Sequence, residues 1–182
     1  MTDALTPEEL HDQMASVTDG EAPKGSDGYK PLRLLAQEAE DLQVISAALQ
    51  DGIAHIGDIR YEPAARRLTM LFNRFRWEVE EGAPGERVYA ALQLGDVGRV
   101  QHRGLSSEDK GALVCCLAMD FEPAEAPGGA VLLLFSGGHE MRIEVECVDA
   151  VLADVSDPWE AAQAPDHPED FFPETAALVD EA

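Results

Sequence analysis

Residues 59–77 read IRYEPAARRLTMLFNRFRW, and this stretch decides the fold class. From position 68 onward the apolar side chains recur at every second residue, at Leu68, Met70 and Phe72. This period indicates a half-buried β-strand, because successive side chains of a strand point to opposite faces. We expect the strand to run on through Trp77.

Further strands are predicted on the C-terminal side of this stretch. Alternating apolar positions define two of them: Val88, Ala90, Leu92 and Leu94, and then Met141, Ile143 and Val145. Segments 114–121 and 130–135 are near-continuous apolar runs, which are typical of buried strands. The link 136–139 (SGGH) predicts a tight hairpin, since its glycines can adopt positive φ.

On the N-terminal side the apolar period becomes helical. The positions concerned are Leu35, Leu42, Ile45 and Leu49. We expect one helix over about 36–50, ended by Gly52 in the left-handed conformation that glycine readily adopts.

The strand region contains an internal similarity. Residues 59–63 (IRYEP) match 119–123 (MDFEP), and each is followed by a turn and an apolar strand. The next strands also share their apolar spacing, at 90, 92, 94, 97 and 100 and at 141, 143, 145, 148 and 151. We expect a pseudo-repeat of about 53–100 and 112–155, with a short helical or bulged exit after each third strand. Chance similarity between two meanders is the alternative.

These elements predict an α+β fold that is mostly β. Two similar three-stranded antiparallel meanders pack face to face as a sandwich or close into a barrel, and the N-terminal helix covers an open face or end.

The charge is concentrated at the two ends of the chain. Residues 1–29 carry seven acids and one lysine, and residues 157–182 carry eight acids and no Lys or Arg. They supply 14 of the 23 net negative charges. Acidic segments rich in Pro and Gly bury too little apolar surface to fold alone. We therefore expect one globular domain, 30–156, between two disordered acidic tails, 1–29 and 157–182.

Two apolar features interrupt these tails. Residues 6–10 (TPEEL) resemble a helix start with Pro at its first position. Phe171 and Phe172 form an apolar pair among acids, and are candidates for binding a partner or the domain itself. A solvated tail with an incidental apolar pair is the alternative.

Composition also bears on location and partners. The chain has three cysteines, an odd number typical of reduced thiols in a reducing compartment, and no apolar run of membrane-spanning length. We expect a cytoplasmic protein. A net charge of −23 disfavours nucleic acid and anionic membranes as partners and suits a basic protein partner.

Motif searches assign no catalytic residue, metal ligand or cofactor. The chain lacks a P-loop, a dinucleotide-binding glycine motif, a nucleophile elbow and C-x-x-C or H-E-x-x-H spacing. Its five histidines are scattered.

The most informative polar cluster is basic. Arg60, Arg67, Arg74 and Arg76 lie close in sequence, and Trp77 follows them. Because Arg binds carboxylates and phosphates bidentately, these residues are candidates for a small-anion or acidic-peptide site with Trp77 as a stacking wall. The alternative is that these arginines pair with nearby acids or with the acidic tails.

Four segments resemble one family. Residues 30–35 (KPLRLL), 39–46 (AEDLQVIS), 73–78 (NRFRWE) and 144–154 (EVECVDAVLAD) are similar to the DUF2948 family of uncharacterised alphaproteobacterial proteins. The resemblance covers about residues 30–160. It implies a bacterial cytoplasmic protein and supplies no mechanism.

Two function classes remain. The first is a non-catalytic cytoplasmic binding or adaptor domain. The alternative is a small enzyme or an anionic-ligand-binding protein that uses the Arg/Trp strand, 73–77.

Overall fold

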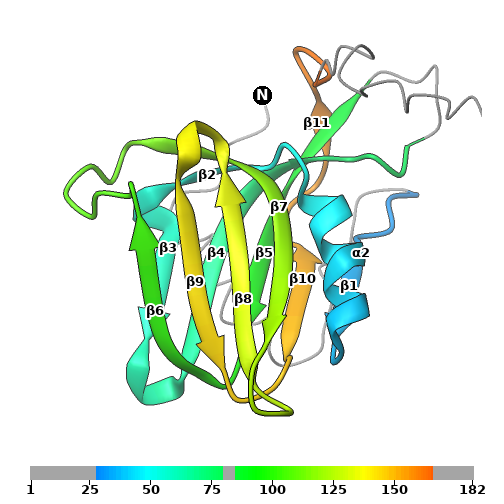
Figure 1. The fold of residues 1–182 in the computed structure, drawn as a ribbon. Coiled ribbons are helices and arrows are strands. Elements are labelled where there is room, and N and C mark those ends of the chain that lie inside the picture. The colour runs from blue at the N-terminus through cyan, green and yellow to red at the C-terminus, as the bar shows by residue number, and fades with distance from the viewer. Residues whose placement is uncertain (1–27, 80–84, 166–182) are drawn as a thin grey trace, which may run out of the picture.

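The structure is a computed structural model that describes residues 28–79 and 85–165. Strands dominate this part of the chain, and α2 (Ala39–Leu49) is its one α-helix (Figure 1). The strands are β1 (Arg33–Ala36), β2 (Ile53–His55), β3 (Ile59–Glu62), β4 (Arg67–Phe75), β5 (Glu86–Leu94), β6 (Val97–Arg103), β7 (Leu113–Pro123), β8 (Gly129–Phe135), β9 (Glu140–Val145), β10 (Ala150–Asp154) and β11 (Trp159–Glu160). Short 3₁₀ turns are η2 (Ile56–Asp58), η3 (Pro63–Ala65) and η4 (Ser136–Gly138). The predicted α+β, mostly-β class is confirmed.

The strands form one antiparallel sheet that bends into two layers (Figure 1). Its order is β1-β10-β5-β4-β2-β7-β8-β9-β6, with β3 beside β4 and β11 beside β5. We call β1, β10, β5 and β4 layer A and β7, β8, β9 and β6 layer B; β2 links them by pairing with both β4 and β7. The sheet is not closed into a barrel, so the sandwich is the arrangement found.

Each layer receives a strand from the other half of the chain. After the meander β3-β4-β5, strand β6 pairs with β9, and after the meander β7-β8-β9, strand β10 pairs with β5. The first exit has the expected bulge, between Val97 and Arg99, but both exits continue as strands rather than as short helical pieces. The pseudo-repeat of 53–100 and 112–155 stays a prediction.

Helix α2 begins later than the predicted 36–50. The Asp41 carboxylate accepts hydrogen bonds from the backbone N–H groups of Gln37 and Glu38, at 3.0 and 3.2 Å. These bonds satisfy donors that precede the first helical turn, so the helix starts only at Ala39. Ala36, expected to be helical, ends β1 instead.

The helix also ends differently from the prediction. Asp51, not Gly52, takes the left-handed conformation, with φ of 59°. Gly52 is needed for another reason: a Cβ atom there would lie 2.8 Å from the carbonyl oxygen of Leu49.

Two strand ends were also predicted from the sequence. The hairpin at 136–139 is confirmed, with φ near 75° at Gly137 and Gly138. Strand β4 stops at Phe75, two residues before the predicted end, because the Trp77 N–H turns back to the Phe75 carbonyl.

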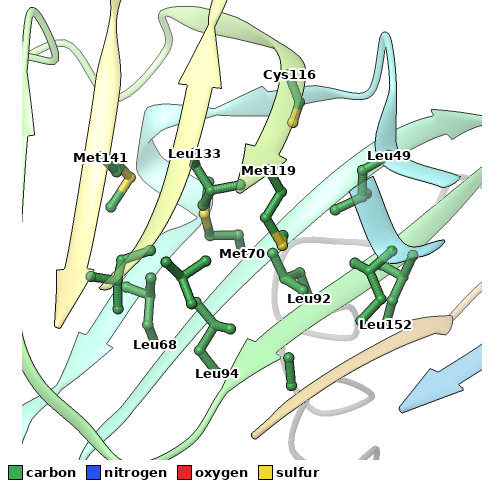
Figure 2. Packing of buried hydrophobic residues seen from close by; sticks show 14 of the residues in the cluster. Leu49, Leu68, Met70, Leu92, Leu94, Cys116, Met119, Leu133, Met141 and Leu152 are labelled. Atoms are coloured by element: carbon green, nitrogen blue, oxygen red, sulfur yellow. The ribbon is translucent and has the colours of Figure 1, made fainter. Parts of the chain in front are cut away.

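The main core lies between the layers. Leu68, Met70 and Leu92 of layer A meet Met119 and Leu133 of layer B, and each is at most 1% exposed (Figure 2). Helix α2 adds the fully buried side chains of Leu42, Ile45 and Leu49 to this cluster.

Helix α2 also protects an edge of β7. Strand β2 pairs with β7 only at residues 113–115. Further along, the Met119 N–H donates to the Ser46 hydroxyl of α2 at 2.8 Å. The helix therefore satisfies part of an edge that would otherwise be open to pairing with another chain.

Strand β11 lies beyond residue 156, where we expected the C-terminal tail to begin. Trp159 and Glu160 pair with Arg87 and Glu86 of β5. Residues 1–27 and 166–182 of the two predicted tails, which include Phe171 and Phe172, lie outside the described residues.

Candidate functional site

Arg74 is the largest of the fully buried side chains in the described residues. It follows Met70 and Phe72 along the inner face of β4, and its five guanidinium N–H groups all have protein acceptors. Nε and Nη2 donate to the two oxygens of Asp154, at 2.8 and 2.9 Å. Nη2 and Nη1 donate to the two oxygens of Glu78, at 2.8 and 3.1 Å, and Nη1 also reaches the Phe75 carbonyl at 3.4 Å.

Asp154, at the end of β10, is also fully buried. Besides Arg74, its Oδ2 accepts the Tyr29 hydroxyl at 2.6 Å and the Leu32 N–H at 2.9 Å. The carboxylate therefore joins β4, β10 and the segment that leads into β1. We call Arg74, Asp154, Glu78 and Tyr29 the buried ionic cluster.

Contacts within this cluster shift its titration. Burial lowers the pKa of the Arg74 guanidinium, but hydrogen bonds to Glu78 and Asp154 outweigh it and raise that pKa above its usual range. Burial raises the pKa of Glu78, yet Arg74 holds it below the usual value. Burial and the bond to Asp154 raise the pKa of Tyr29. Arg74 and Glu78 are thus held charged at neutral pH and Tyr29 is held neutral.

Two other predicted site arginines, Arg76 and Arg67, also have acidic partners. Arg76 forms ion pairs with Glu78 and Glu86, and its guanidinium carbon lies 4.7 Å from the centre of the Tyr29 ring. Arg67 donates to Glu62 through Nε and Nη2 at 3.2 and 3.1 Å. Pairing with nearby acids was the alternative interpretation of these arginines.

The five predicted residues do not meet at one point. Arg74, Arg76 and Trp77 lie at or just beyond the end of β4, whereas Arg67 begins this strand and Arg60 lies on the adjacent β3. Seven residues of strand separate Arg67 from Arg74, roughly 23 Å at the usual rise per residue. The structure therefore brings Arg74 and Arg76 together and leaves Arg60 and Arg67 at the far end.

Trp77 is 39% exposed and anchored by its edge. Its indole Nε1 donates to the Gln50 carbonyl at 3.0 Å, and its ring lies 4.7 Å from the Phe75 ring, centre to centre. The next residue after Gln50, Asp51, donates its N–H to the Cys116 carbonyl. Trp77 thus lies beside the place where β7 meets β2.

An apolar surface extends outward from this place. Leu113 and Leu117 of β7 and Leu134 of β8 are 60%, 49% and 38% exposed. Cys115 lies between the first two on the same face, paired with Ile53 of β2, and Leu134 is opposite Ala118. We call Leu113, Cys115, Leu117, Leu134 and Ile53 the outer apolar strip.

The exposure of this surface could not be predicted from the apolar pattern of its strands. Segments 114–121 and 130–135 were interpreted as strands buried on both faces, and this was wrong for one face. In β7, Val114, Cys116 and Met119 are buried while Leu117 is not. The strand carries apolar side chains on both sides, so periodicity contains no signal for which side is covered.

The cysteines are free thiols in different surroundings. Burial raises the pKa of the Cys116 thiol to about 12, whereas Cys115, on the opposite side of β7, is partly exposed. Cys147 is also partly exposed, and its thiol lies 3.2 Å from a carboxylate oxygen of Asp96.

Residues 28–79 and 85–165 show neither a candidate metal site nor a membrane-spanning helix. They contain no group of three or more His, Cys, Asp or Glu side chains placed to hold a metal ion. No helix in this part of the chain has the length and apolar character needed to cross a bilayer.

Comparison with known proteins identifies a family. The family model described as "Protein of unknown function (DUF2948)" matches residues 32–167. No curated protein and no solved structure matches the chain significantly. The match spans most of the chain and agrees with the resemblance seen in the sequence, so this protein belongs to the DUF2948 family.

Proposed function

We propose that this protein is a non-catalytic cytoplasmic binding domain that holds a partner protein on its outer apolar strip. The observation that carries the proposal is the exposure of Leu113, Leu117 and Leu134 on neighbouring strands, at 60%, 49% and 38%. Apolar side chains grouped on a surface, with polar groups around them, are typical of protein interaction sites.

The surroundings of the strip favour a basic partner. Asp120 lies on β7 beyond Leu117, opposite Leu132 of β8, and Cys115 has Asp51 near it, with a weaker influence from Arg87. The whole chain carries a net charge of −23. We therefore propose a partner segment with apolar side chains flanked by Lys or Arg, since opposite charge speeds encounter and disfavours acidic competitors.

Trp77 is the predicted site residue that this proposal retains. It borders the strip through Gln50 and exposes part of its ring, as aromatic anchors of interfaces do. Arg74 is not part of the proposed binding surface; its guanidinium binds acids of the protein itself. An anionic ligand would have to displace Asp154 or Glu78, because every guanidinium donor of Arg74 is already used.

The cytoplasmic part of the proposal is supported by the thiols. Cys115, Cys116 and Cys147 are all free. Free thiols are typical of reducing compartments.

The test is affinity purification of the full-length protein from its native cell, followed by direct binding of the recovered protein. We expect a stoichiometric partner whose affinity for purified Leu117→Asp or Leu134→Asp falls at least tenfold. Leu35→Asp is the matched control, because Leu35 is a leucine 61% exposed on β1, away from the strip. A partner that binds all of these variants equally well contradicts the proposal, and a co-purified small molecule would support the ligand-binding alternative.

A further inference from the structure

A second apolar cluster lies on the side of layer A that faces away from the core. It consists of Leu71, Ala91, Ala153 and Val155, with Tyr89 and Val151 packed against it. Strand register places these residues on one face, because Leu71 is opposite Ala91 and Ala91 is opposite Ala153. We call them the back face of layer A.

The centre of the back face is almost inaccessible to solvent, whereas Leu35 at its β1 edge, opposite Val151, is 61% exposed. Leu71, Ala91, Ala153 and Val155 are 5%, 1%, 5% and 2% exposed. The pleat points these side chains away from the sheet, so such low values require other groups over them, and the neighbouring Tyr89, Val151 and Trp159 side chains are the described part of that cover.

The described elements supply only part of that cover. Helix α2 buries Leu42, Ile45 and Leu49 in the main core, on the other side of layer A. Strand β11 lies in the plane of the sheet beside β5, and its Trp159 ring contacts the Tyr89 ring of the back face, with 4.9 Å between ring centres. Within residues 28–79 and 85–165, no helix or strand therefore lies over the back face.

The rim of the back face is basic. Arg33 is opposite Ala153, Arg60 is opposite Thr69 and Arg87 is opposite Phe75, so these three side chains project from the same side as the apolar cluster. An apolar centre with arginines at its margins suits an amphipathic segment that carries acids.

Residues 6–17 (TPEELHDQMASV) have this character. Thr6 and Glu9 have the spacing of a capping box, with Pro7 at the first helical position. Leu10, Met14 and Val17 recur at i, i+4 and i+7 and so form one helical stripe. Glu8, Glu9 and Asp12 provide acids for the arginine rim.

The chain can reach the face. Tyr29 is held by Asp154, next to Val155 of the back face. Residues 18–28 can span up to roughly 36 Å when extended, and a helix of residues 7–17 is about 16 Å long. That length covers about four strands at their usual spacing.

We propose that residues 7–17 dock as an amphipathic helix on the back face of layer A, with Leu10, Met14 and Val17 toward Leu71, Ala91 and Ala153. The segment forms a third layer of the fold. The back face and the outer apolar strip lie on the same side of the bent sheet and adjoin where Ile53 is opposite Asn73, but they share no residue, and the docking proposal does not rest on the proposed function.

The test compares two neighbouring substitutions in the full-length protein. Met14→Asp places a charge on the apolar stripe, and Ala15→Asp introduces the same charge about 100° around the helix. Each substitution is combined with Val151→Cys, which places a reporter thiol on the back face. The rate at which a thiol reagent labels position 151 is then measured by peptide mass spectrometry. We expect Met14→Asp to speed labelling at position 151 at least tenfold, and Ala15→Asp to leave it within about twofold.

Cys115 of β7 lies on the same side of the sheet but is separated from β4 by β2, and it is the internal control because the proposed helix lies over β4, β5 and β10, so the labelling rate of Cys115 should not change in either variant. Amide hydrogen exchange supplies the second measurement. We expect slowed exchange at residues 10–17 in the unaltered chain and fast exchange in Met14→Asp. Fast exchange of these residues in the unaltered chain overturns the proposal. Slowed exchange at Phe171 and Phe172 instead, with labelling at 151 unaffected by Met14→Asp, overturns it in favour of the C-terminal segment.

Discussion

The buried ionic cluster and the outer apolar strip invert the usual arrangement of a soluble protein. Arg74 and Asp154 are charged and fully buried, whereas Leu113 and Leu117 are apolar and about half exposed. Buried charges require partners for every donor and acceptor, and Arg74 has them. Leu113 and Leu117 have apolar side chains, so they need no hydrogen-bond partners within the protein. The buried ionic cluster therefore stabilises the fold, whereas the outer apolar strip is accessible for the proposed partner.

The largest expected effect is at Asp154. Asp154→Ala leaves the Arg74 guanidinium buried with two of its five hydrogen bonds missing, and also removes the acceptor of Tyr29 and Leu32. Breaking one side of a buried ion pair costs about 3–5 kcal/mol. We expect a loss of this size in the free energy of unfolding, measured by urea denaturation.

The double variant Arg74→Met/Asp154→Leu sharpens this prediction. Replacing both charges by apolar side chains removes the uncompensated charge, so it should destabilise the protein less than Asp154→Ala. If the double variant is less stable than Asp154→Ala, the ion pair contributes a net gain to the free energy of unfolding, beyond the mutual neutralisation of its two charges.

A smaller effect is expected where α2 protects β7, the strand that carries most of the strip. Ser46→Ala removes the acceptor of the Met119 N–H, and Met119 is only 1% exposed. An unsatisfied backbone donor costs about 1–3 kcal/mol. Thermal and urea unfolding should show a loss within this range. Ala48→Ser in the same helix, which removes no hydrogen-bond acceptor, is the control, and equal losses in the two variants would contradict the role of the Ser46 hydroxyl.

Glu78 gives a pH-dependent prediction. Its folded pKa is below the unfolded value, so its contribution to stability is present above about pH 4.3 and is lost as pH falls through the folded pKa. Glu78 is 39% exposed, and pairs open to solvent contribute roughly 0.2–1 kcal/mol. Glu78→Gln should therefore lower stability slightly at pH 7 and progressively less below pH 4. Glu108→Gln, in an exposed loop, should show no such difference, and a Glu78→Gln deficit that grows in acid would contradict the assignment.

The smallest effect on stability is expected at the strip itself. Leu117→Asp and Leu134→Asp replace side chains that are 49% and 38% exposed, and surface changes usually stay within about 0.5 kcal/mol. Urea unfolding should show little change even though partner binding is lost. A destabilisation above about 2 kcal/mol would show that these leucines support the fold, and the contrast with Asp154 would fail.

Much of the fold could be predicted from alternation and turn chemistry. The face of Leu68, Met70 and Phe72, the glycine hairpin at 137–138 and the single helix were all recognised in the sequence. The alternation does not reveal where a strand goes after its meander. Val97 and Val100 look like a bulged exit, but they belong to a strand whose partner, β9, lies more than 40 residues away.

The candidate site was predicted less well. The sequence showed arginines close together and acids nearby, but not which of them pair. Glu62 and Glu78 are local partners within five residues, whereas Asp154 lies 80 residues from Arg74. The pairing of Arg74 with the Asp154 carboxylate therefore could not be predicted from residues close in sequence.

Local periodicity, composition and direct residue matches are enough to predict the mostly-β class, the one described helix, the acidic ends and the membership of the DUF2948 family. The burial of Arg74 with Asp154 and the outward direction of Leu117 and Leu134 depend instead on the three-dimensional packing. Burial depends on what the rest of the chain brings against a residue, and an apolar strand has the same sequence whether one face or both are covered.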